Sequence, residues 1–259
     1  MTLAELLIEL RENMLHDRSD QVAGSASDYL WSDATLTQYI NQAYFRFARE
    51  ALCIRDAQTP NITTFKTAAN QQTYQLDPSV IAVISARVVG EPCDLARAGH
   101  SDFGTYHTPD SYFFDPSQLS NLPPGKPLAF GTDEYLGQTQ MGTTSAIVMY
   151  LYPMVSPTYA GLPIQLRVVR EPVSRLTNPT DLPELPMTHH LEMLDWAAYL
   201  ALRVVDHDAG DPVRAQEFKA SFEDATRKAR LLAMRKMFTP LQHGFGRGGW
   251  SWEGNGYGI

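Results

Sequence analysis

Two adjacent histidines and a nearby carboxylate are the residues of this chain best suited to chemistry. His189, His190 and Glu192 all belong to residue types that bind zinc, and a hydrolase could use such a metal to activate water. His189 and Glu192 stand at i and i+3, so one helix face can carry both. Adjacent histidines, however, point about 100° apart on a helix, and the H-E-x-x-H spacing is missing. We therefore predict the polar start of a helix here, and a metal-dependent hydrolase using these three residues is the alternative.

Other motifs that resemble catalytic signatures lack the context that such chemistry needs. Residues 244–249 match G-x-G-x-x-G, but a dinucleotide-binding loop needs a strand before it and a helix after it. Here a helical pattern precedes the glycines, so we interpret the match as coincidence. The acidic residues flanking His207 are expected to end a helix. The chain has neither a G-x-S-x-G elbow nor a P-loop, and we predict a protein that is not an enzyme, without catalytic residues, cofactor or metal site.

The C-terminal segment combines many glycines with large aromatic residues. Seven glycines lie between Gly244 and Gly258, interleaved with Phe245, Trp250, Trp252 and Tyr257. Dense glycine raises the entropy cost of ordering the backbone, whereas aromatic residues are favoured anchors in the pockets of a partner. We therefore predict a flexible extension over 239–259 that binds another protein.

Apolar residues at helical spacing mark both ends of the chain. They predict helices over 2–15 and 33–55, the second with Ser32 as its N-cap and with Trp31 and Leu36 placed as a hydrophobic staple. Helical spacing returns from Leu191 to about 205 and again over 212–238, where Asp211 is the expected cap. Each helix needs a partner to bury its stripe, so the two ends are expected to form one helical bundle.

Segments rich in β-branched residues separate these helices. They predict strands at 62–65, 73–76, 80–89, 146–152 and 164–169, and the short turn before the last one favours antiparallel pairing of the last two. No crossover helix lies between the strands, which favours an antiparallel β-sandwich or barrel-like domain. The predicted fold class is thus α+β: a helical bundle from 1–58 and 183–238, an inserted β-rich domain at 59–182, and the extension at 239–259. Residues 92–127 show little periodicity.

Charge is distributed unevenly along the chain. The net charge is −8, which argues against a free-standing DNA-binding protein. The helical segment 212–238, in contrast, carries seven basic and three acidic residues, so the remainder is near −12. One interpretation is that its basic residues form a stripe that faces a partner or DNA. The simpler interpretation is a solvent-exposed face with intrahelical ion pairs such as Glu223–Arg227 and Asp224–Lys228. The proposed stripe comprises Arg227, Arg230, Arg235 and Lys236.

The remaining composition predicts a protein without export or membrane signals. Cys53 and Cys93 form no C-x-x-C motif and are expected to be reduced, mostly buried thiols. We expect no signal peptide and no membrane span.

The order of these features resembles the head-to-tail adaptor (connector or neck) proteins of short-tailed phages. Leu-Trp-Ser-Asp at 30–33, followed by Leu-x-x-Tyr-Ile-Asn-Gln-Ala at 36–43, looks like the opening of that family. The resemblance covers most of 30–230. Further matching segments are 54–56, 74–77, 81–87, 125–127 with Asp133, 166–172, 181–186 with His190, 195–199, 206–208 and 215–222.

The resemblance implies a structural virion protein at the head–tail junction, assembled in the host cytoplasm. It implies a homo-oligomeric ring, typically a dodecamer, between the portal protein and the tail nozzle or tube, with genomic DNA passing non-specifically through the lumen during ejection. It also implies that the C-terminal extension binds between portal subunits. The residues expected to bind the portal are Phe245, Arg247, Trp250, Trp252 and Tyr257.

A carbohydrate-binding module is a further alternative. Its motivation is the run Tyr112, Phe113 and Phe114 in the β-rich segment, since aromatic rings stack on sugars. A helical bundle is not needed for that activity.

Overall fold

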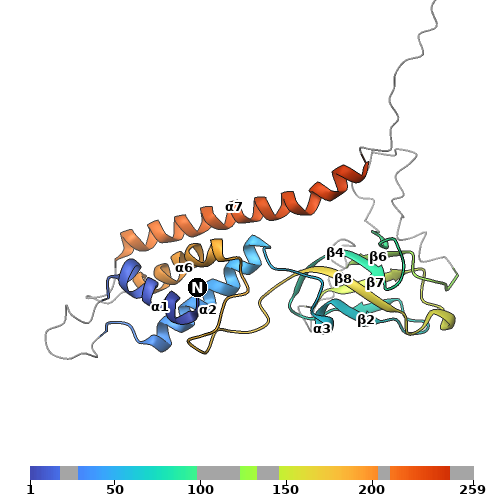
Figure 1. Cartoon of the computed structure of the whole chain (residues 1–259), viewed down its shortest axis with the longest axis horizontal. Coiled ribbons are helices and arrows are strands. Elements are labelled where there is room, and N and C mark those ends of the chain that lie inside the picture. Colours follow the sequence, from blue (N-terminus) through green and yellow to red (C-terminus); the bar gives the residue numbers. More distant parts are fainter. Residues whose placement is uncertain (18–28, 98–122, 133–145, 204–210, 246–259) are drawn as a thin grey trace, which may run out of the picture.

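Helices and strands occupy separate parts of the molecule (Figure 1). The structure is a computed structural model and describes residues 1–17, 29–97, 123–132, 146–203 and 211–245. The helical part contains α1 (Leu3–Glu9), which continues as the π-helical segment η1 (Leu10–Leu15), then α2 (Asp33–Ala51), α6 (His190–Leu202) and α7 (Pro212–Phe245). Short helical turns are α3 (Pro60–Thr63), η3 (Pro157–Tyr159) and η4 (Met187–His189). The predicted α+β class is confirmed.

Local capping fixes where the helices begin and end. The Ser32 hydroxyl accepts a hydrogen bond from the Thr35 amide at 3.1 Å, and the Asp211 carboxylate accepts one from the Arg214 amide, also at 3.1 Å. Both predicted N-caps are therefore confirmed. Helix α2 ends at Ala51 rather than at 55, because Leu52 adopts a left-handed conformation with φ 54°.

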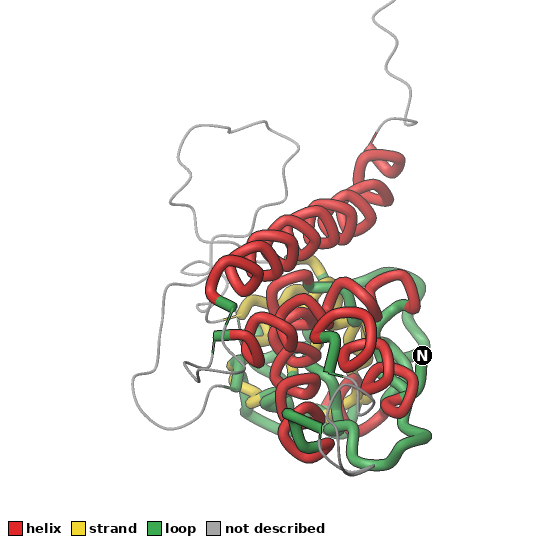
Figure 2. The backbone as a smooth tube through the Cα atoms, turned by 90° about the vertical axis from the view of Figure 1, so that its left-hand side faces the viewer, coloured by secondary structure: helices red, strands yellow, loops and turns green. Residues whose placement is uncertain are grey.

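One apolar core joins the helices from the two ends of the chain. Leu36, Ile40 and Phe47 of α2 and Phe222 of α7 are fully buried in it. Helix α7 packs against α6 and α2, and α1 with η1 covers another side of α6. Figure 2 shows α7 on the outside of the other helices. The bundle predicted from the apolar spacing is thus formed.

The strands that the structure describes form two four-stranded sheets. In the first, β8 (Pro163–Arg170) pairs along one edge with β4 (Val80–Val88) and along the other with β1 (Arg55–Asp56) and β2 (Thr64–Lys66), all antiparallel. The second has the order β3 (Thr73–Gln75), β7 (Val148–Tyr152), β6 (Ala129–Thr132) and β5 (Ala96–Arg97). Only its β5–β6 pairing is parallel. Buried residues of both sheets, including Val168 and Met149, share one apolar cluster.

Two details of the predicted strands are wrong. The segments 146–152 and 164–169 are not paired: β7 lies in the second sheet, and β8 in the first. The connection contains Pro153 and the turn η3 at Pro157–Tyr159, so the chain crosses between sheets instead of forming a tight hairpin. The strand expected at 62–65 begins only at Thr64, because Pro60 starts the helical turn α3.

Helix α7 continues seven residues beyond the predicted end of the bundle. The extension was predicted to be flexible from Thr239, whereas α7 reaches Phe245. Pro240, which has no backbone N–H, and Gly244, a poor helix former, are the residues that favoured an earlier end in the sequence. With 34 residues, α7 is about 51 Å long, and it runs from the bundle toward the strands (Figure 1).

Polar contacts connect α7 to β1 and α2 to the segment that follows β8. The Arg55 guanidinium in β1 donates to the backbone carbonyl of Ala233 in α7. The Glu184 amide donates to the Tyr44 hydroxyl of α2 at 2.8 Å. Burial raises the pKa of Tyr44 to about 12, so its hydroxyl stays protonated.

Candidate partner-binding surfaces

The predicted portal-binding residues lie at and beyond the end of α7. Phe245 is the last residue of the helix. Arg247, Trp250, Trp252 and Tyr257 lie outside the described residues, as do the aromatic run Tyr112–Phe114 and the acidic residues around His207. The structure therefore places the start of this predicted anchor at the tip of a long helix.

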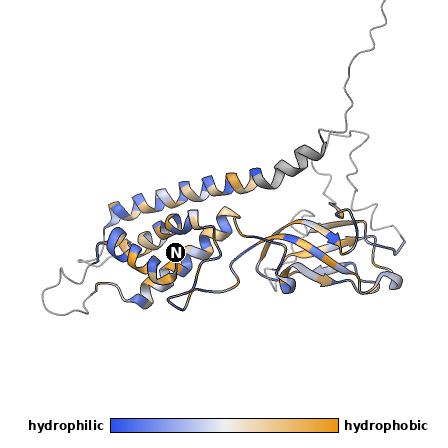
Figure 3. Cartoon of the chain, in the orientation of Figure 1, coloured by the Kyte–Doolittle hydropathy of each residue, from blue (hydrophilic) through white to orange (hydrophobic). Residues whose placement is uncertain are grey.

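The basic stripe lies on the second half of α7. Arg227 and Arg230 are exposed, Arg235 is also exposed, and Lys236 belongs to the same helix. The coloured part of this helix carries both hydrophilic and hydrophobic residues along its length (Figure 3). The ion pair Asp224–Lys228 forms at 2.5 Å as predicted, but Arg227 also pairs with Asp224 and not with Glu223, whose partner is Lys219 at 3.9 Å.

The two histidines are occupied by contacts within the bundle. His190 is buried; its Nε2 donates to the Leu185 carbonyl at 3.0 Å, and its Nδ1 accepts from the Met1 ammonium at 2.9 Å. Burial lowers the pKa of His190, with further lowering from the Met1 charge, so the ring is neutral. His189 Nδ1 lies 2.6 Å from Glu192. Within the described ranges no group of three metal-binding side chains comes together, and with both His190 nitrogens engaged the predicted helix start describes these residues better than a zinc site does.

Asp195, near the same cluster, has a structural contact as well. The Ser221 hydroxyl of α7 donates to its carboxylate at 2.6 Å, which ties α6 to α7. Burial raises the pKa of Asp195. This carboxylate therefore stabilises helix packing.

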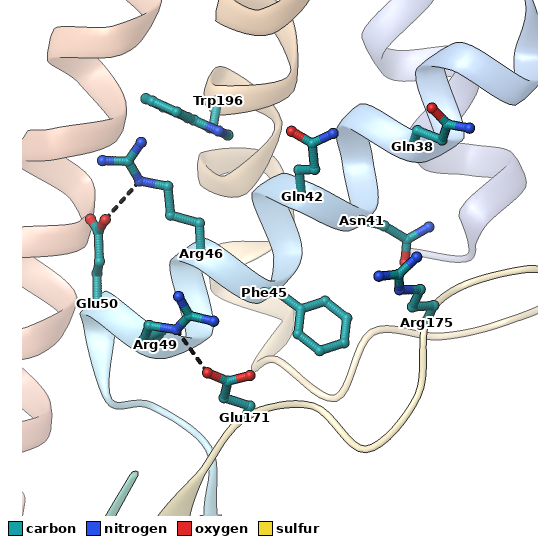
Figure 4. A pocket seen from close by; sticks show the side chains of 10 residues that line it. All are labelled: Gln38, Asn41, Gln42, Phe45, Arg46, Arg49, Glu50, Glu171, Arg175 and Trp196. Carbon is teal, nitrogen blue, oxygen red and sulfur yellow. Dashed lines mark hydrogen bonds and ion pairs between the residues drawn. The ribbon is translucent and has the colours of Figure 1, made fainter. Parts of the chain in front are cut away.

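A polar groove along α2 was not predicted from the sequence (Figure 4). It has a volume of about 900 Å³ and is bordered by α2, by Trp196 of α6, and by Glu171 and Arg175 in the segment after β8. The Arg46 guanidinium lies 3.6 Å from the centre of the Trp196 ring and pairs with Glu50 at 2.7 Å, while Arg49 pairs with Glu171 at 2.7 Å. The Arg46–Glu50 spacing of i, i+4 was readable from the sequence, but the approach of Trp196 depends on tertiary packing. Such a groove of charged and amide side chains suits protein contacts better than enclosure of a small molecule.

The two cysteines differ in their exposure to solvent. Cys53 is half-buried, and burial raises the pKa of its thiol to about 11. Cys93 lies in a surface bend after the end of β4 and is exposed. The prediction that both thiols are mostly buried is therefore wrong for Cys93. Both are free thiols. Among the described residues, each helix is too short or too polar to cross a lipid bilayer.

A helical bundle with an inserted β domain is the architecture implied by the resemblance to phage head-to-tail adaptors. The SU10 adaptor protein family model matches residues 1–243. The chain therefore belongs to the SU10 adaptor protein family, and it is a phage adaptor protein. No curated protein matches the chain.

Proposed function

We propose that this chain joins the portal to the tail of a phage as a ring at the head–tail junction of the virion. The match of the adaptor family over 1–243 carries the proposal. A dodecamer is the expected ring, assembled in the host cytoplasm, with the tail nozzle or tube on its other side. The groove along α2 and the exposed faces of α7 give such an assembly polar and mixed surfaces for subunit contacts.

We propose that the helical bundle, 1–58 with 183–238, and the β-rich insertion, 59–182, are separate domains. Their support is the pair of apolar clusters, one built on α2, α6 and α7 and the other on the strands. The ion pairs of Arg170, in the insertion, with Asp56 and Glu184, in the bundle, connect the two.

The C-terminal extension is proposed to anchor the ring to the portal. Helix α7 extends past the bundle to Phe245, and the sequence continues with Arg247, Trp250, Trp252 and Tyr257. Aromatic and arginine side chains dominate the energetics of protein interfaces. Because a ring presents many copies at once, a modest affinity per copy is sufficient for stable attachment.

Deleting 246–259 tests this anchor without shortening α7. The shortened chain is expected to keep the thermal unfolding of the full chain and to lose co-sedimentation with the portal. Retained portal binding by the shortened chain would reject the anchor.

The acidic balance of the chain outside α7 is proposed to let DNA pass through the ring without binding to it. Phosphate contacts depend on lysine and arginine, and the residues outside 212–238 have a net charge near −12. Replacing carboxylates that line the lumen with lysine is expected to slow DNA ejection, and an unchanged ejection rate would argue against this role.

A further inference from the structure

The second half of α7 carries an exposed stripe that its own chain leaves uncovered in the described residues. Thr226, Ala229 and Ala233 are buried and form the face toward the bundle. Leu231 is two residues, about 200°, from Ala229, and it is 53% exposed, while Met234 is 37% exposed. The helix therefore has a second apolar line on the side away from its own core.

This second line has the spacing of a helix-packing seam. Arg227, Leu231 and Met234 follow at intervals of four and three, and the sequence places apolar residues at 238, 241 and 245 with the same alternation. That repeat is the one by which two helices pack side by side. Asp224 pairs with both Arg227 and Lys228. Five basic residues between 225 and 245 still outnumber this one carboxylate, so two such seams would repel each other. The charge calls for an acidic partner surface.

Helix α1 presents such a surface in the same chain. Glu5, Ile8 and Glu9 of α1 and Glu12 at the start of η1 follow one another at intervals of three, one and three, and Ile8 is 56% exposed. Arg11, the cation nearest in sequence, is buried and already bound to Asp33 at 2.6 Å. The described residues give neither Glu9 nor Glu12 an ion-pair partner. Ile8 among these glutamates is complementary, in apolar surface and in charge, to Leu231 and Met234 beside the arginines of α7.

The two surfaces belong to different regions of one molecule. Helix α1 contacts α2 and α6, whereas the seam lies on the side of α7 turned away from the bundle. From this complementarity we infer that the basic seam of α7 (Arg227, Arg230, Leu231 and Met234) binds the acidic face of α1 and η1 (Glu5, Ile8, Glu9 and Glu12) of a second copy of the chain. Such a contact joins unlike surfaces, and contacts of this kind close into rings when the rotation between copies permits. The inference rests on the proposed ring and specifies which surfaces build it.

A charge-swap experiment on the full-length chain tests this contact. One variant carries Arg227→Glu and Arg230→Glu, the other Glu9→Lys and Glu12→Lys. In sedimentation velocity the wild-type chain is expected to associate with rising concentration, and each variant alone to associate at least about tenfold more weakly, because like charges then face each other. A mixture of the two variants is expected to associate again, because each variant now complements the other. Raising the salt concentration should weaken the wild-type association.

A matched control separates the seam from the general charge of α7. Lys219→Glu with Lys228→Glu makes the same charge change on the same helix and also removes two intrahelical pairs, those with Glu223 and Asp224. This control is expected to associate like the wild-type chain, and circular dichroism must show all variants folded. Variants that associate as well as the wild-type chain, or a mixture that stays apart, would overturn these surfaces while leaving a ring in place.

Two other results would also overturn the contact. If the wild-type chain stays monomeric at every concentration, self-association through α7 is rejected. Imaging of the chain with the portal then tests independently whether a ring forms there. If Arg227→Glu with Arg230→Glu abolishes binding to duplex DNA while self-association is unchanged, the seam is a DNA contact and the inference is wrong.

Discussion

Arg170 at the end of β8 and Asp56 in β1 form a buried ion pair, with 2.7 Å between Nε and Oδ2. The same guanidinium reaches Glu184 at 2.6 Å, in the segment that leads to α6. Glu184 in turn donates its amide to Tyr44 of α2. The pair therefore sits where the strands meet the helical bundle, and it links both.

Replacing Arg170 with methionine is expected to destabilise the chain by about 3–5 kcal/mol, because Asp56 would remain buried without its counter-charge. Urea unfolding measures this loss. Arg49→Met is the control, since the Arg49 side chain is 63% exposed in its pair with Glu171 and its removal should change the free energy of unfolding by at most about 1 kcal/mol. Equal effects of the two substitutions would contradict the role of the buried pair.

The Asp56 carboxyl should make the folded state sensitive to acid. Burial alone would raise its pKa, but hydrogen bonds from Thr59, Gln58 and Arg170 outweigh burial and hold the pKa well below the usual range. The unfolded chain then takes up this proton more readily than the folded chain, so the stabilisation is present above about pH 4 and is lost as the pH falls further.

Comparing the wild-type chain with Asp56→Asn isolates this effect. The difference in free energy of unfolding between them is expected to shrink as the pH is lowered from about 5 to about 2.5. A difference that stays constant over this range would show that Asp56 keeps an ordinary pKa in the folded chain.

The cluster of His189, His190 and Glu192 is expected to hold no metal. Both ring nitrogens of His190 are engaged by Leu185 and Met1, so a chelator should leave the thermal unfolding of the purified chain unchanged. Metal analysis of the same preparation provides the second readout. Stoichiometric zinc, or a fall in the unfolding temperature after chelation, would revive the hydrolase alternative.

The aromatic residues of the extension should be more important for portal binding than its length. Trp250→Ser with Trp252→Ser keeps the chain length and is expected to weaken co-sedimentation with the portal at least about tenfold, because such residues are typical interface anchors. Serine substitutions at Gly248 and Gly249 are the control and should bind normally. Weakening by the control alone would point to backbone flexibility instead.

Features set by neighbours in sequence were predictable, and those set by distant packing were not. Ser32 and Asp211 cap helices through residues only three positions away, so residue type and spacing were sufficient to predict both. Pro153 and η3 exclude a tight hairpin between β7 and β8, but β8 pairs with β1, β2 and β4, which lie far from it in sequence. The apolar core that the two sheets share decides which strands pair in each sheet.

The exposed surfaces of the molecule also depend partly on local sequence and partly on distant packing. The basic residues of α7 were visible in the sequence, but the exposure of Leu231 and Met234 became apparent only with the bundle in place, because Ala229 and Ala233 occupy the buried face. Likewise Arg46 and Trp196 are 150 residues apart and meet only because α2 packs on α6.

Electron microscopy of the full-length chain mixed with its portal protein would show whether the chain forms a ring on the portal. We expect a closed ring of copies on the portal axis, with density for the C-terminal extension reaching between portal subunits. Portal particles without added density, or with single copies bound away from the axis, would contradict this expectation.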